Sequence, residues 1–395
     1  MTTSFWQQSD QVPPISCDIA IIGGGIIGTS TAYWIKRLDP SCNVVLLDAH
    51  AIGFGASGRN AGFLLQGTSS NYATGKQTFG DEVARALWRF THENRALVGE
   101  HANAARINLG ESGSLLVSGT ESEQDALERS AEFLIQEGVP AELWDTTRLE
   151  ASCKAQGFYG ALYVASGASM NPIRLLQEIA GQSGANILEH HAVLDITYHG
   201  NHCQISTHQR QIRAERVFIA LNAYLPQLLP DTAKYVHPIR AQMLASTPQT
   251  TWLPVPIYSH EGYYYIRQAP DGSVLLGGAR HLFKEEEVGY GDATTPHLQE
   301  ALEQYYKTHF TEAPPLSVAK RWSGTMAFTP DGLPLFSEAE GLPGSFWAAG
   351  FNGHGMGYGF RFGKLMANVF NNKDEDSYYR NLFHKSRLSS IIKLN

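Results

Sequence analysis

Hydrophobic and polar positions near the start of the chain follow a strand, helix, strand order. Asp18–Ile22 is a short apolar run typical of a buried parallel strand. Gly23-Gly24-Gly25 interrupts this run, and Ile26–Leu38 then has helical periodicity, which the proline of Asp39-Pro40 ends. Asn43–Leu47 predicts a second buried strand. The pattern therefore predicts a β-α-β unit with a glycine turn at its first corner.

Farther along, the pattern predicts a loop, another buried strand, a hairpin and several helices. A glycine-rich loop is expected over 53–67, and Val217–Ala220 is another buried run. Turn residues at Pro270-Asp271-Gly272 lie between 263–268 and 273–277 and predict a hairpin. Helices are expected over 80–105, over 121–138, over 172–181 with Asn171 as N-cap and Pro172 at the first position, over 296–309, and from the glycine cluster 350–359 to about Phe370.

The composition is that of a folded, acidic protein. Hydrophobic residues make up 43% and charged residues 17% of 395 residues, which excludes a largely disordered chain. With 30 Lys and Arg against 38 Asp and Glu, the net charge of −8 argues against a nucleic-acid partner, since phosphate binding needs basic patches. The 38 glycines exceed an average content of roughly 7%. Much of this excess lies in three short clusters.

The four cysteines predict neither a metal site nor a disulfide framework. Cys17, Cys42, Cys153 and Cys203 are far apart and have no zinc-type spacing, so reduced structural thiols are expected. Residues 1–16 have neither the basic nor the apolar region of a signal peptide. No apolar run approaches the roughly 18 residues that span a membrane. The expectation is a soluble, cytoplasmic protein without a transmembrane segment.

The first glycine cluster has the spacing of a dinucleotide-binding turn. Gly23, Gly25 and Gly28 follow the first predicted strand and open the helix, and Asp48 ends the second strand. The glycines permit a tight turn, close approach of the backbone to a pyrophosphate and close packing of helix on strand. The helix amino-terminus favours phosphate, and Asp48 would accept hydrogen bonds from a ribose. The pattern predicts a dinucleotide site without separating FAD from NAD.

Two further segments carry a resemblance to a known family. Residues 55–62 (GASGRNAG) resemble the second flavin-contacting loop of the D-amino-acid oxidase/glycine oxidase-like family of FAD-dependent oxidoreductases. Residues 350–356 (GFNGHGM) resemble the closing flavin segment of that family, and weaker matches lie between them in family order. The matches run over roughly residues 17 to 370. The pattern looks closest to amine-directed members such as γ-glutamylputrescine oxidoreductases.

The resemblance implies an α/β (α+β) fold with a Rossmann-like FAD-binding domain that is discontinuous in sequence. An inserted substrate domain with a mixed or antiparallel sheet is expected to cover the flavin ring. The bounds are expected as 15–80, 150–230 and 320–375 for the FAD-binding domain, 81–149 and 231–319 for the substrate domain, and 376–395 for a carboxy-terminal tail.

The fingerprint and the resemblance together imply a set of cofactor contacts. The glycine-led last helix would place backbone N–H groups against the flavin, because glycine has no Cβ in the way. The expected contacts are Gly23, Gly25, Ile26, Ile27, Gly28, Asp48, Ala49, Gly55, Ala56, Ser57, Gly58, Arg59, Asn60, Ala61, Gly62, Val193, Gly324, Gly350, Asn352, Gly353, His354, Gly355 and Met356.

The implied reaction is oxidation of a carbon–nitrogen bond. A neutral amine can pass hydride from its α-carbon to flavin N5, and the imine product then hydrolyses, so a side-chain base is not obligatory. Arg59 has either an electrostatic role beside the flavin or a structural ion pair. His354 either faces the flavin or substrate or is a hydrogen-bonded buried histidine.

Other candidates lie on the predicted hairpin and near Trp322. Alternation places Tyr263, Tyr265 and Arg267 on one strand face, which is either a substrate wall with a cation for a carboxylate or ordinary cross-strand packing. Trp322, expected just before a turn at Gly324, is a second wall candidate.

Two more cations and a charge run complete the list. Arg240 and Arg280 are further candidates for binding an anion. The run Lys284–Glu287 is expected to be a solvated face.

The chain departs from the family pattern at three positions. The resemblance expects a carboxylate-binding arginine in the strand near residue 326, where this chain has Met326. In the sarcosine-oxidase branch a lysine would stand at Gly357 and a flavin-linking cysteine near Thr325. A buried carboxylate needs a charge-assisted partner. FAD is therefore expected to be non-covalent, and any carboxylate clamp would have moved to Arg267 or Arg280.

The expected function is that of an FAD-dependent amine or amino-acid oxidase or dehydrogenase. Its partners would be a small amine or amino-acid substrate and O₂ or another electron acceptor. One alternative is a glycine- or D-amino-acid-type deaminating oxidase with a relocated clamp. A non-catalytic flavin-binding subunit and an NAD-dependent dehydrogenase are the alternatives from other classes. The sequence does not determine the oligomeric state.

Overall fold

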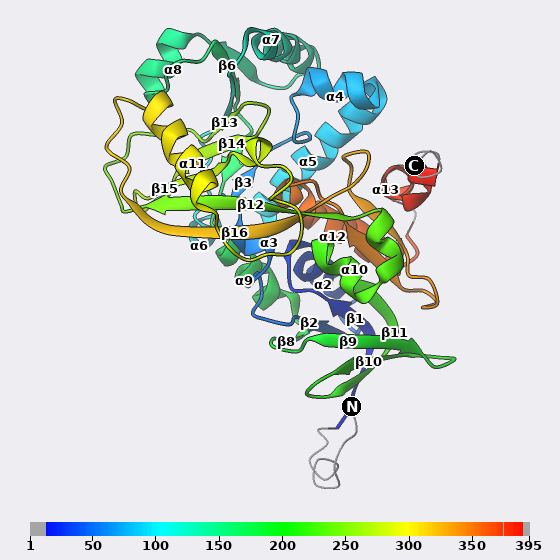
Figure 1. Ribbon diagram of the computed structural model, residues 1–395. Coiled ribbons are helices and arrows are strands. Elements are labelled where there is room, and N and C mark those ends of the chain that lie inside the picture. The colour runs from blue at the N-terminus through cyan, green and yellow to red at the C-terminus, as the bar shows by residue number, and fades with distance from the viewer. Residues whose placement is uncertain (1–12, 374, 390–395) are drawn as a thin grey trace.

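The chain is organised around two large sheets, which lie in the lower and upper parts of Figure 1. The computed structural model describes residues 13–373 and 375–389. Most of the amino-terminal segment considered above for a signal peptide lies outside the described residues. Within them, the chain forms two eight-stranded sheets and one two-stranded sheet. The mixed α/β class expected from the sequence is confirmed.

The first sheet has a parallel centre built from the expected β-α-β unit. Its strands are β1 (Ile15–Ile22), β2 (Val44–Leu47), β8 (Asn186–Leu188), β9 (Val193–Tyr198), β10 (Cys203–Thr207), β11 (Gln211–Ile219), β17 (Leu335–Glu338) and β18 (Phe346–Ala349). β1 pairs in parallel with β2 and β11, and β8 and β18 extend the parallel part. β17 and the β9–β10 hairpin join by antiparallel pairing.

Helices from distant parts of the sequence pack around this sheet. They are α2 (Ile26–Leu38), α3 (Ala56–Arg59), α5 (Asp81–His101), α6 (Ala104–Ile107), α9 (Pro172–Ser183), α10 (Leu225–Leu228), α12 (Gly355–Phe370) and α13 (Ser377–Phe383), with short 3-10 turns η1 (Asn222–Tyr224), η2 (Pro230–Lys234) and η4 (Lys385–Ser389). α2 packs directly on α12 and α9. A Cβ on Gly363 would lie 2.6 Å from the carbonyl carbon of Ser30, so the close contact of α12 with α2 depends on glycine. None of the described helices is long and apolar enough to cross a membrane.

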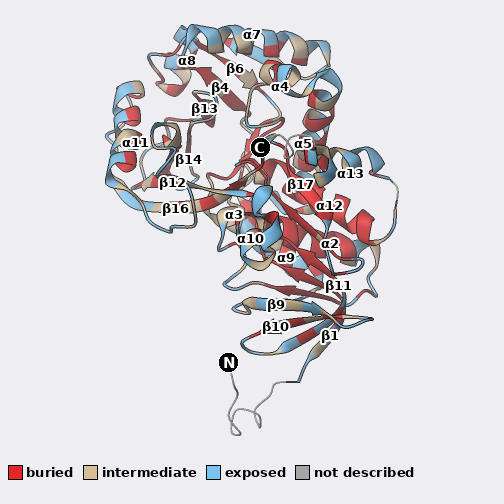
Figure 2. Cartoon of the chain, turned by 45° about the vertical axis from the view of Figure 1, so that its right-hand side comes forward, coloured by how far each residue is buried: buried red, intermediate tan, exposed pale blue. Residues whose placement is uncertain are grey.

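The second sheet is mixed and lies above the first. Its strands are β4 (Ser114–Ser118), β5 (Ala141–Trp144), β6 (Gly160–Val164), β12 (His237–Ser246), β13 (Ile257–Ser259), β14 (Tyr264–Gln268), β15 (Val274–Gly278) and β16 (Val318–Phe328). Its helical elements are α4 (Tyr72–Phe79), α7 (Glu121–Gln136), α8 (Thr146–Cys153), α11 (Pro296–His309) and η3 (Arg280–Leu282). β13 runs parallel to β4, whereas the other neighbours are antiparallel. Figure 2 shows the buried residues concentrated where helices meet these sheets.

Several expected elements are confirmed almost residue for residue. α2 and α11 have the expected bounds, and α12 ends at Phe370. The predicted hairpin is β14 with β15. Asn171 caps α9, because its side-chain oxygen accepts a hydrogen bond from the N–H of Arg174.

Three expectations differ from the structure. Gly324 lies inside β16, paired with Ala241, and is not in a turn. The loop over 53–67 contains α3 and the strand β3 (Phe63–Leu64), which pairs with β7 (Ala168–Ser169). In the expected solvated run, Lys284, Glu285 and Glu286 are exposed, but Glu287 is fully buried because Arg240 provides a charged partner for it.

Strand pairing also places three segments differently from the expected domain bounds. β6 and β16 belong to the second sheet, although the bounds assign their residues to the FAD-binding part. The described part of the 376–395 tail packs against elements of the first sheet, and Phe383 and Leu388 are buried there. Residues 390–395 of this tail lie outside the described residues.

Candidate functional site

The corner between β1 and α2 requires glycine on geometric grounds. Gly23 has φ of +111°, and a Cβ there would lie 2.5 Å from the carbonyl oxygen of Ala220. A Cβ on Gly28 would lie 1.9 Å from the carbonyl oxygen of Gly23. Gly25 is the N-cap of α2 and offers no side-chain cap. Gly23, Gly25 and Ile26 at this helix start line a neighbouring cavity, and a helix start beside a cavity is an arrangement that binds phosphate.

Asp48 is fixed beside the same helix start. Its Oδ2 accepts a hydrogen bond of 2.7 Å from the N–H of Gly24, and its Oδ1 accepts one of 2.7 Å from the N–H of His50. Burial raises the pKa of this carboxyl above its usual value, while these two hydrogen bonds act in the opposite direction. The carboxylate therefore faces the cavity in a fixed orientation.

The helix start opens into a cavity of about 600 Å³, here called the long cavity. This volume is within the range typical of small-molecule and cofactor sites. Its walls include Asp48 and Val193 at one end and Gly324 and Met356 at the other.

The second glycine segment folds into α3, and Asn60 holds its shape. The side-chain nitrogen of Asn60 donates to the carbonyl oxygens of Ala56 (3.1 Å) and Ser57 (2.8 Å), and its oxygen accepts from the N–H of Gly62 (2.7 Å). Ser57 Oγ accepts a 2.9 Å hydrogen bond from the N–H of Ile26 at the start of α2. The first two glycine motifs are thus joined directly.

The third glycine segment leads into α12 along the same cavity. Asn352 has a left-handed φ of +49°, and its side chain donates to the carbonyl oxygen of Gly350 at 2.6 Å. His354 is the N-cap of α12. A Cβ on Gly357 would lie 2.8 Å from the carbonyl oxygen of Leu65, so the lysine of the sarcosine-oxidase branch does not fit at this position without a shift of the chain.

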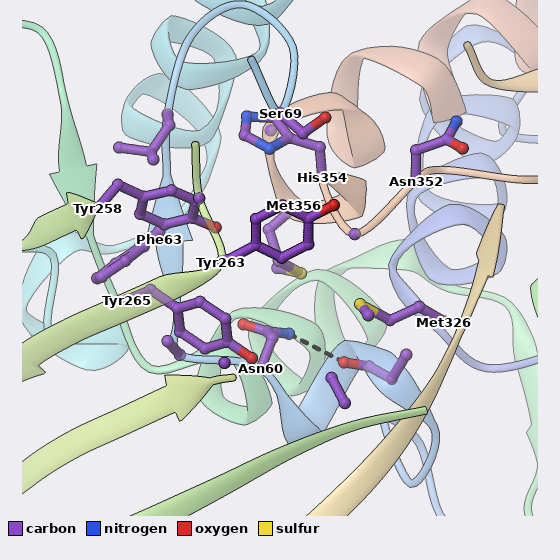
Figure 3. A pocket seen from close by; sticks show the side chains of 18 of the residues that line it. Asn60, Phe63, Ser69, Tyr258, Tyr263, Tyr265, Met326, Asn352, His354 and Met356 are labelled. Carbon is purple, nitrogen blue, oxygen red and sulfur yellow. Dashed lines mark hydrogen bonds between the residues drawn. The ribbon is translucent and has the colours of Figure 1, made fainter. Parts of the chain in front are cut away.

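A second cavity of about 290 Å³, here called the aromatic cavity, adjoins the long cavity. Figure 3 shows Tyr258 and Tyr265 on one side of it, the Tyr263 ring in the middle of the view, and Met326 and Asn352 on the other side. The rings of Tyr258 and Tyr265 stack with centroids 5.7 Å apart. The two cavities share seven lining residues: Ala56, Arg59, Asn60, Gly324, Met326, Gly353 and Met356.

His354 lines the aromatic cavity as a neutral imidazole. Burial lowers its pKa to about 4, and its Nε2 is buried with no hydrogen-bond partner among the described residues. The ring therefore adds no charge to the wall of the aromatic cavity above about pH 4.

The four candidate cations have different surroundings. Arg59 lines both cavities but is held by Asp292 at 2.6 Å and by the carbonyl oxygen of Ser323 at 2.9 Å. Arg240 forms two 2.8 Å hydrogen bonds to the buried carboxylate of Glu287.

The other two cations differ in their access to the aromatic cavity. Arg267 is buried outside the lining of both cavities and donates to the carbonyl oxygen of Met170 at 3.0 Å. Arg280 lines the aromatic cavity. Trp322 lines neither cavity, and its indole nitrogen donates to the carbonyl oxygen of Arg59 at 2.9 Å.

Comparison with known proteins identifies the family. The model of the DAO family, described as FAD dependent oxidoreductase, matches residues 18–369. The chain belongs to this family. It is 26% identical to γ-glutamylputrescine oxidoreductase of Escherichia coli, over 90% of this chain and 84% of that protein. It is also 26% identical to glycine oxidase of Geobacillus kaustophilus, over 90% of this chain and 93% of that protein.

Solved structures share the fold of this DAO-family chain. The crystal structure of glycine oxidase from G. kaustophilus has a TM-score of 0.77 at 22% identity, covering 91% of this chain and 95% of that one. L-proline dehydrogenase from P. horikoshii has a TM-score of 0.78 at 20% identity, covering 93% and 98%. The expected DAO-type architecture is confirmed, and FAD is the expected cofactor of this oxidoreductase.

The residues of this DAO-family chain fit FAD. The long cavity joins a helix start without a side-chain cap and a fixed acid to the aromatic cavity, so a dinucleotide at one end would present its ring system at the other. Among the expected cofactor residues, the following line the long cavity: Gly23, Gly25, Ile26, Ile27, Asp48, Ala49, Gly55, Ala56, Ser57, Arg59, Asn60, Val193, Gly324, Gly353, Gly355 and Met356.

The other expected cofactor residues lie elsewhere. Ala61, Asn352 and His354 line the aromatic cavity, as does the candidate Tyr265. Gly28, Gly58, Gly62 and Gly350 line neither cavity, and at each a Cβ would come within 2.2 Å of a neighbouring atom, so they serve close packing.

Sequence reasoning missed several lining residues of this DAO-family site. Phe63, Met243 and Tyr258 line the aromatic cavity, and Tyr224 and Asp292 line the long one. None belongs to a glycine motif. Tyr258 reaches the cavity because β13 pairs with β14, which puts it opposite Tyr265, and this is a long-range property that local patterns do not carry.

Proposed function

We propose that the protein binds FAD non-covalently in the long cavity and oxidises the C–N bond of an amine or amino-acid derivative held in the aromatic cavity. The observation that carries this proposal is the junction of the two cavities. Asn60, Gly324, Met326 and Gly353 line both, so a ring at the end of the long cavity would meet a molecule in the aromatic one.

Bound FAD supplies a two-electron acceptor for the reaction. The amine loses two electrons and two protons to become an imine, and water then converts the imine into a carbonyl compound and a free amine or ammonia. The electrons leave for O₂, which becomes H₂O₂, or for another acceptor.

The protein side chains would orient the substrate and exclude water. Tyr258, Tyr263 and Tyr265 provide an apolar wall, which favours the uncharged form of an amine. His354 stays neutral above about pH 4 and can hydrogen-bond to a bound molecule. The start of α12, with Gly355 in the long cavity, favours negative charge on whatever lies against it.

Two further expectations rest on the cysteines. Among the described residues, no cysteine lines either cavity, which supports non-covalent binding of FAD. All four thiols are buried and unpaired, in keeping with the expected reducing cytoplasm.

The relatives support the amine class, since they include γ-glutamylputrescine oxidoreductase and glycine oxidase. A deaminating amino-acid oxidase with a relocated carboxylate clamp is the second candidate. The specific observation that favours it is Arg280 in the wall of the aromatic cavity.

The test is an anaerobic absorbance titration of the purified protein with amines and amino acids. Bleaching of flavin bands by one substrate class would support the proposal and name that class. Bands that bleach with dithionite but with no amine would indicate the non-catalytic flavin subunit. A colourless protein that does not take up added FAD would overturn the proposal. Release of the flavin by acid precipitation tests non-covalent binding, and a peroxide assay in air tests O₂ as acceptor.

A further inference from the structure

A tight backbone turn places Arg280 at the wall of the aromatic cavity. β15 ends at Gly278, where a Cβ would lie 2.0 Å from the carbonyl oxygen of Tyr263. Ala279 follows in the left-handed region with φ of +60°, which is unfavourable for a residue with a side chain. Because Ala279 is fully buried, the packing around it holds this conformation. The turn starts η3 at Arg280 and fixes where that side chain leaves the sheet.

The Arg280 guanidinium has aromatic neighbours, and no carboxylate oxygen of the described residues lies within 4.0 Å of its nitrogens. Its central carbon lies 4.9 Å from the ring centroid of Tyr263 and 4.8 Å from that of Phe328. No described residue forms a salt bridge or a side-chain hydrogen bond with it. Aromatic rings attract a guanidinium without taking up its N–H donors, so these donors stay available for an oxyanion.

Two other candidate arginines, Arg59 and Arg240, differ from Arg280 because each has an acidic partner. Arg59 has Asp292 at 2.6 Å, and Arg240 has the buried Glu287 at 2.8 Å. Both are therefore neutralised by this chain itself. Burial raises the pKa of Tyr265 to about 12, and the charge of Arg280 acts against that rise. The field of Arg280 thus reaches Tyr265 in the aromatic wall of the same cavity.

Arg280 also lies close to the junction of the two cavities. The ring centroid of Phe328 lies 4.8 Å from the central carbon of the Arg280 guanidinium, and its Cζ atom is 4.0 Å from the Cβ position at Gly353. Gly353 lines both cavities. About one aromatic ring therefore separates the guanidinium from the junction. A carboxylate bound to Arg280 would keep a nearby C–N bond of the same molecule at the junction.

We propose that Arg280 binds the carboxylate of the substrate, so that the substrates are amines carrying a carboxylate. This inference rests on the proposed function, because it concerns the same cavity and reaction. It assigns the clamp to Arg280 and not to Arg267, which lies outside the lining of both cavities and donates to Met170. Met326, where the family resemblance expects an arginine, provides an apolar surface 3.3 Å from the Cβ position at Gly353.

The test compares Arg280→Met and Arg280→Lys with the wild-type holoenzyme. The first readout is the shift of the flavin absorbance on titration with butyrate and with benzoate, which have a carboxylate and no amine. Loss of a charge-assisted hydrogen bond predicts that Arg280→Met raises the Kd for these anions about 10- to 100-fold. Arg280→Lys keeps a positive charge but loses the planar guanidinium with its paired N–H donors. Its Kd is therefore expected to lie between that of the wild type and that of Arg280→Met.

The second readout is anaerobic flavin reduction by matched pairs that differ by one carboxylate. The pairs are glycine with methylamine, and N-methylglycine with dimethylamine. The wild type is expected to be reduced faster by the acid of at least one pair, and Arg280→Met is expected to lose that preference. Arg129→Met is the control, since Arg129 is an exposed arginine on α7 and is expected to behave as wild type.

Each outcome decides the inference independently of the proposed function. Unchanged anion binding in Arg280→Met, or a loss in Arg267→Met instead, overturns the assignment of the clamp while amine oxidation stands. If no amine reduces the wild-type flavin, the proposed function fails, and the anion titration still decides whether Arg280 binds carboxylates. If Arg280→Met does not retain FAD, the Kd values of Arg280→Lys and the wild type for the two anions are compared instead. Equal Kd values would then overturn the assignment of the clamp.

Discussion

The two cavities are built in different ways, although they share a wall. The long cavity takes lining residues from all three glycine segments, each of which is continuous in sequence. The aromatic cavity is formed by side chains such as Phe63, Tyr258 and Met243, which come from strands far apart in the chain. A backbone site needs small residues at fixed spacing, whereas a side-chain site needs only a particular shape after folding.

This difference explains what each cavity can recognise. Backbone N–H groups and a helix start suit phosphates, which are common to all dinucleotides. A wall of aromatic side chains with one cation lacking an acidic partner suits one class of small molecule. Changes at the long cavity are therefore expected to affect folding and FAD retention, and changes at the aromatic cavity to affect the choice of substrate.

The strongest test of the backbone argument compares two glycine-to-alanine changes. Gly28→Ala would place a Cβ 1.9 Å from the carbonyl oxygen of Gly23, so we expect a loss of about 3 kcal/mol or more in stability and low FAD occupancy. Gly181→Ala is the control, because Gly181 lines neither cavity and no atom lies within 4 Å of its Cβ position. Urea unfolding and the flavin-to-protein absorbance ratio measure both effects. Equal behaviour of the two variants would contradict the close-packing argument.

A second test asks whether Arg240, which is paired with Glu287, contributes to stability and not to the carboxylate binding proposed for Arg280. Arg240→Met leaves the fully buried Glu287 without its charged partner, and we expect a loss of about 3–5 kcal/mol. The carboxylate affinity of the folded holoenzyme should not change, because Arg240 lines neither cavity. Arg106→Met is the control: its pair with Glu178 has a 72% exposed arginine side chain, so about 0–1 kcal/mol is expected. Denaturant unfolding distinguishes the two.

The burial of His354 predicts a pH dependence of stability. Its pKa is about 4 in the folded protein and close to 6.5 when unfolded, so the unfolded chain takes up the proton first as the pH falls. The stability that depends on neutral His354 is complete above about pH 6.5 and is lost as the pH falls toward 4. The loss amounts to about 3 kcal/mol over this range.

The variant His354→Asn should flatten that dependence, because asparagine does not titrate and remains a good N-cap for α12. Unfolding of both proteins at pH 7 and pH 5 provides the measurement. His260, whose pKa burial also lowers to about 4, contributes equally to both, so the difference between the proteins reports His354. Parallel profiles would show that His354 takes up its proton as readily when folded as when unfolded.

The smallest effect is expected at the boundary of the two cavities. Asp292→Asn removes the acidic partner of Arg59, but the Asp292 side chain is 62% exposed, so the loss of stability should be about 0.5 kcal/mol. Because Arg59 and Asp292 both line the long cavity, we also expect faster release of FAD on dilution. A loss of several kcal/mol would mean that this pair organises the junction.

The long cavity could be predicted from the sequence to a larger extent than the aromatic cavity. The turn at Gly23, the helix α2 and the position of Asp48 follow from local rules of chain geometry, and their expected order matches the structure. Arg267 and Trp322 were also candidates, yet both lie outside the cavity linings. Strand alternation predicts on which face of the sheet a side chain lies. It does not predict which other elements cover that face.

The sequence by itself determined the β-α-β unit, the glycine turns and the family, because backbone constraints act over a few neighbouring residues. Only the tertiary structure decided which charges are neutralised. Glu287 looks like part of a solvated run in sequence and is buried against Arg240, whereas Arg280 looks no different from Arg240 and has no acidic partner. Pairing between residues about fifty positions apart depends on how β12 and its neighbours assemble, and a local pattern contains no record of that assembly.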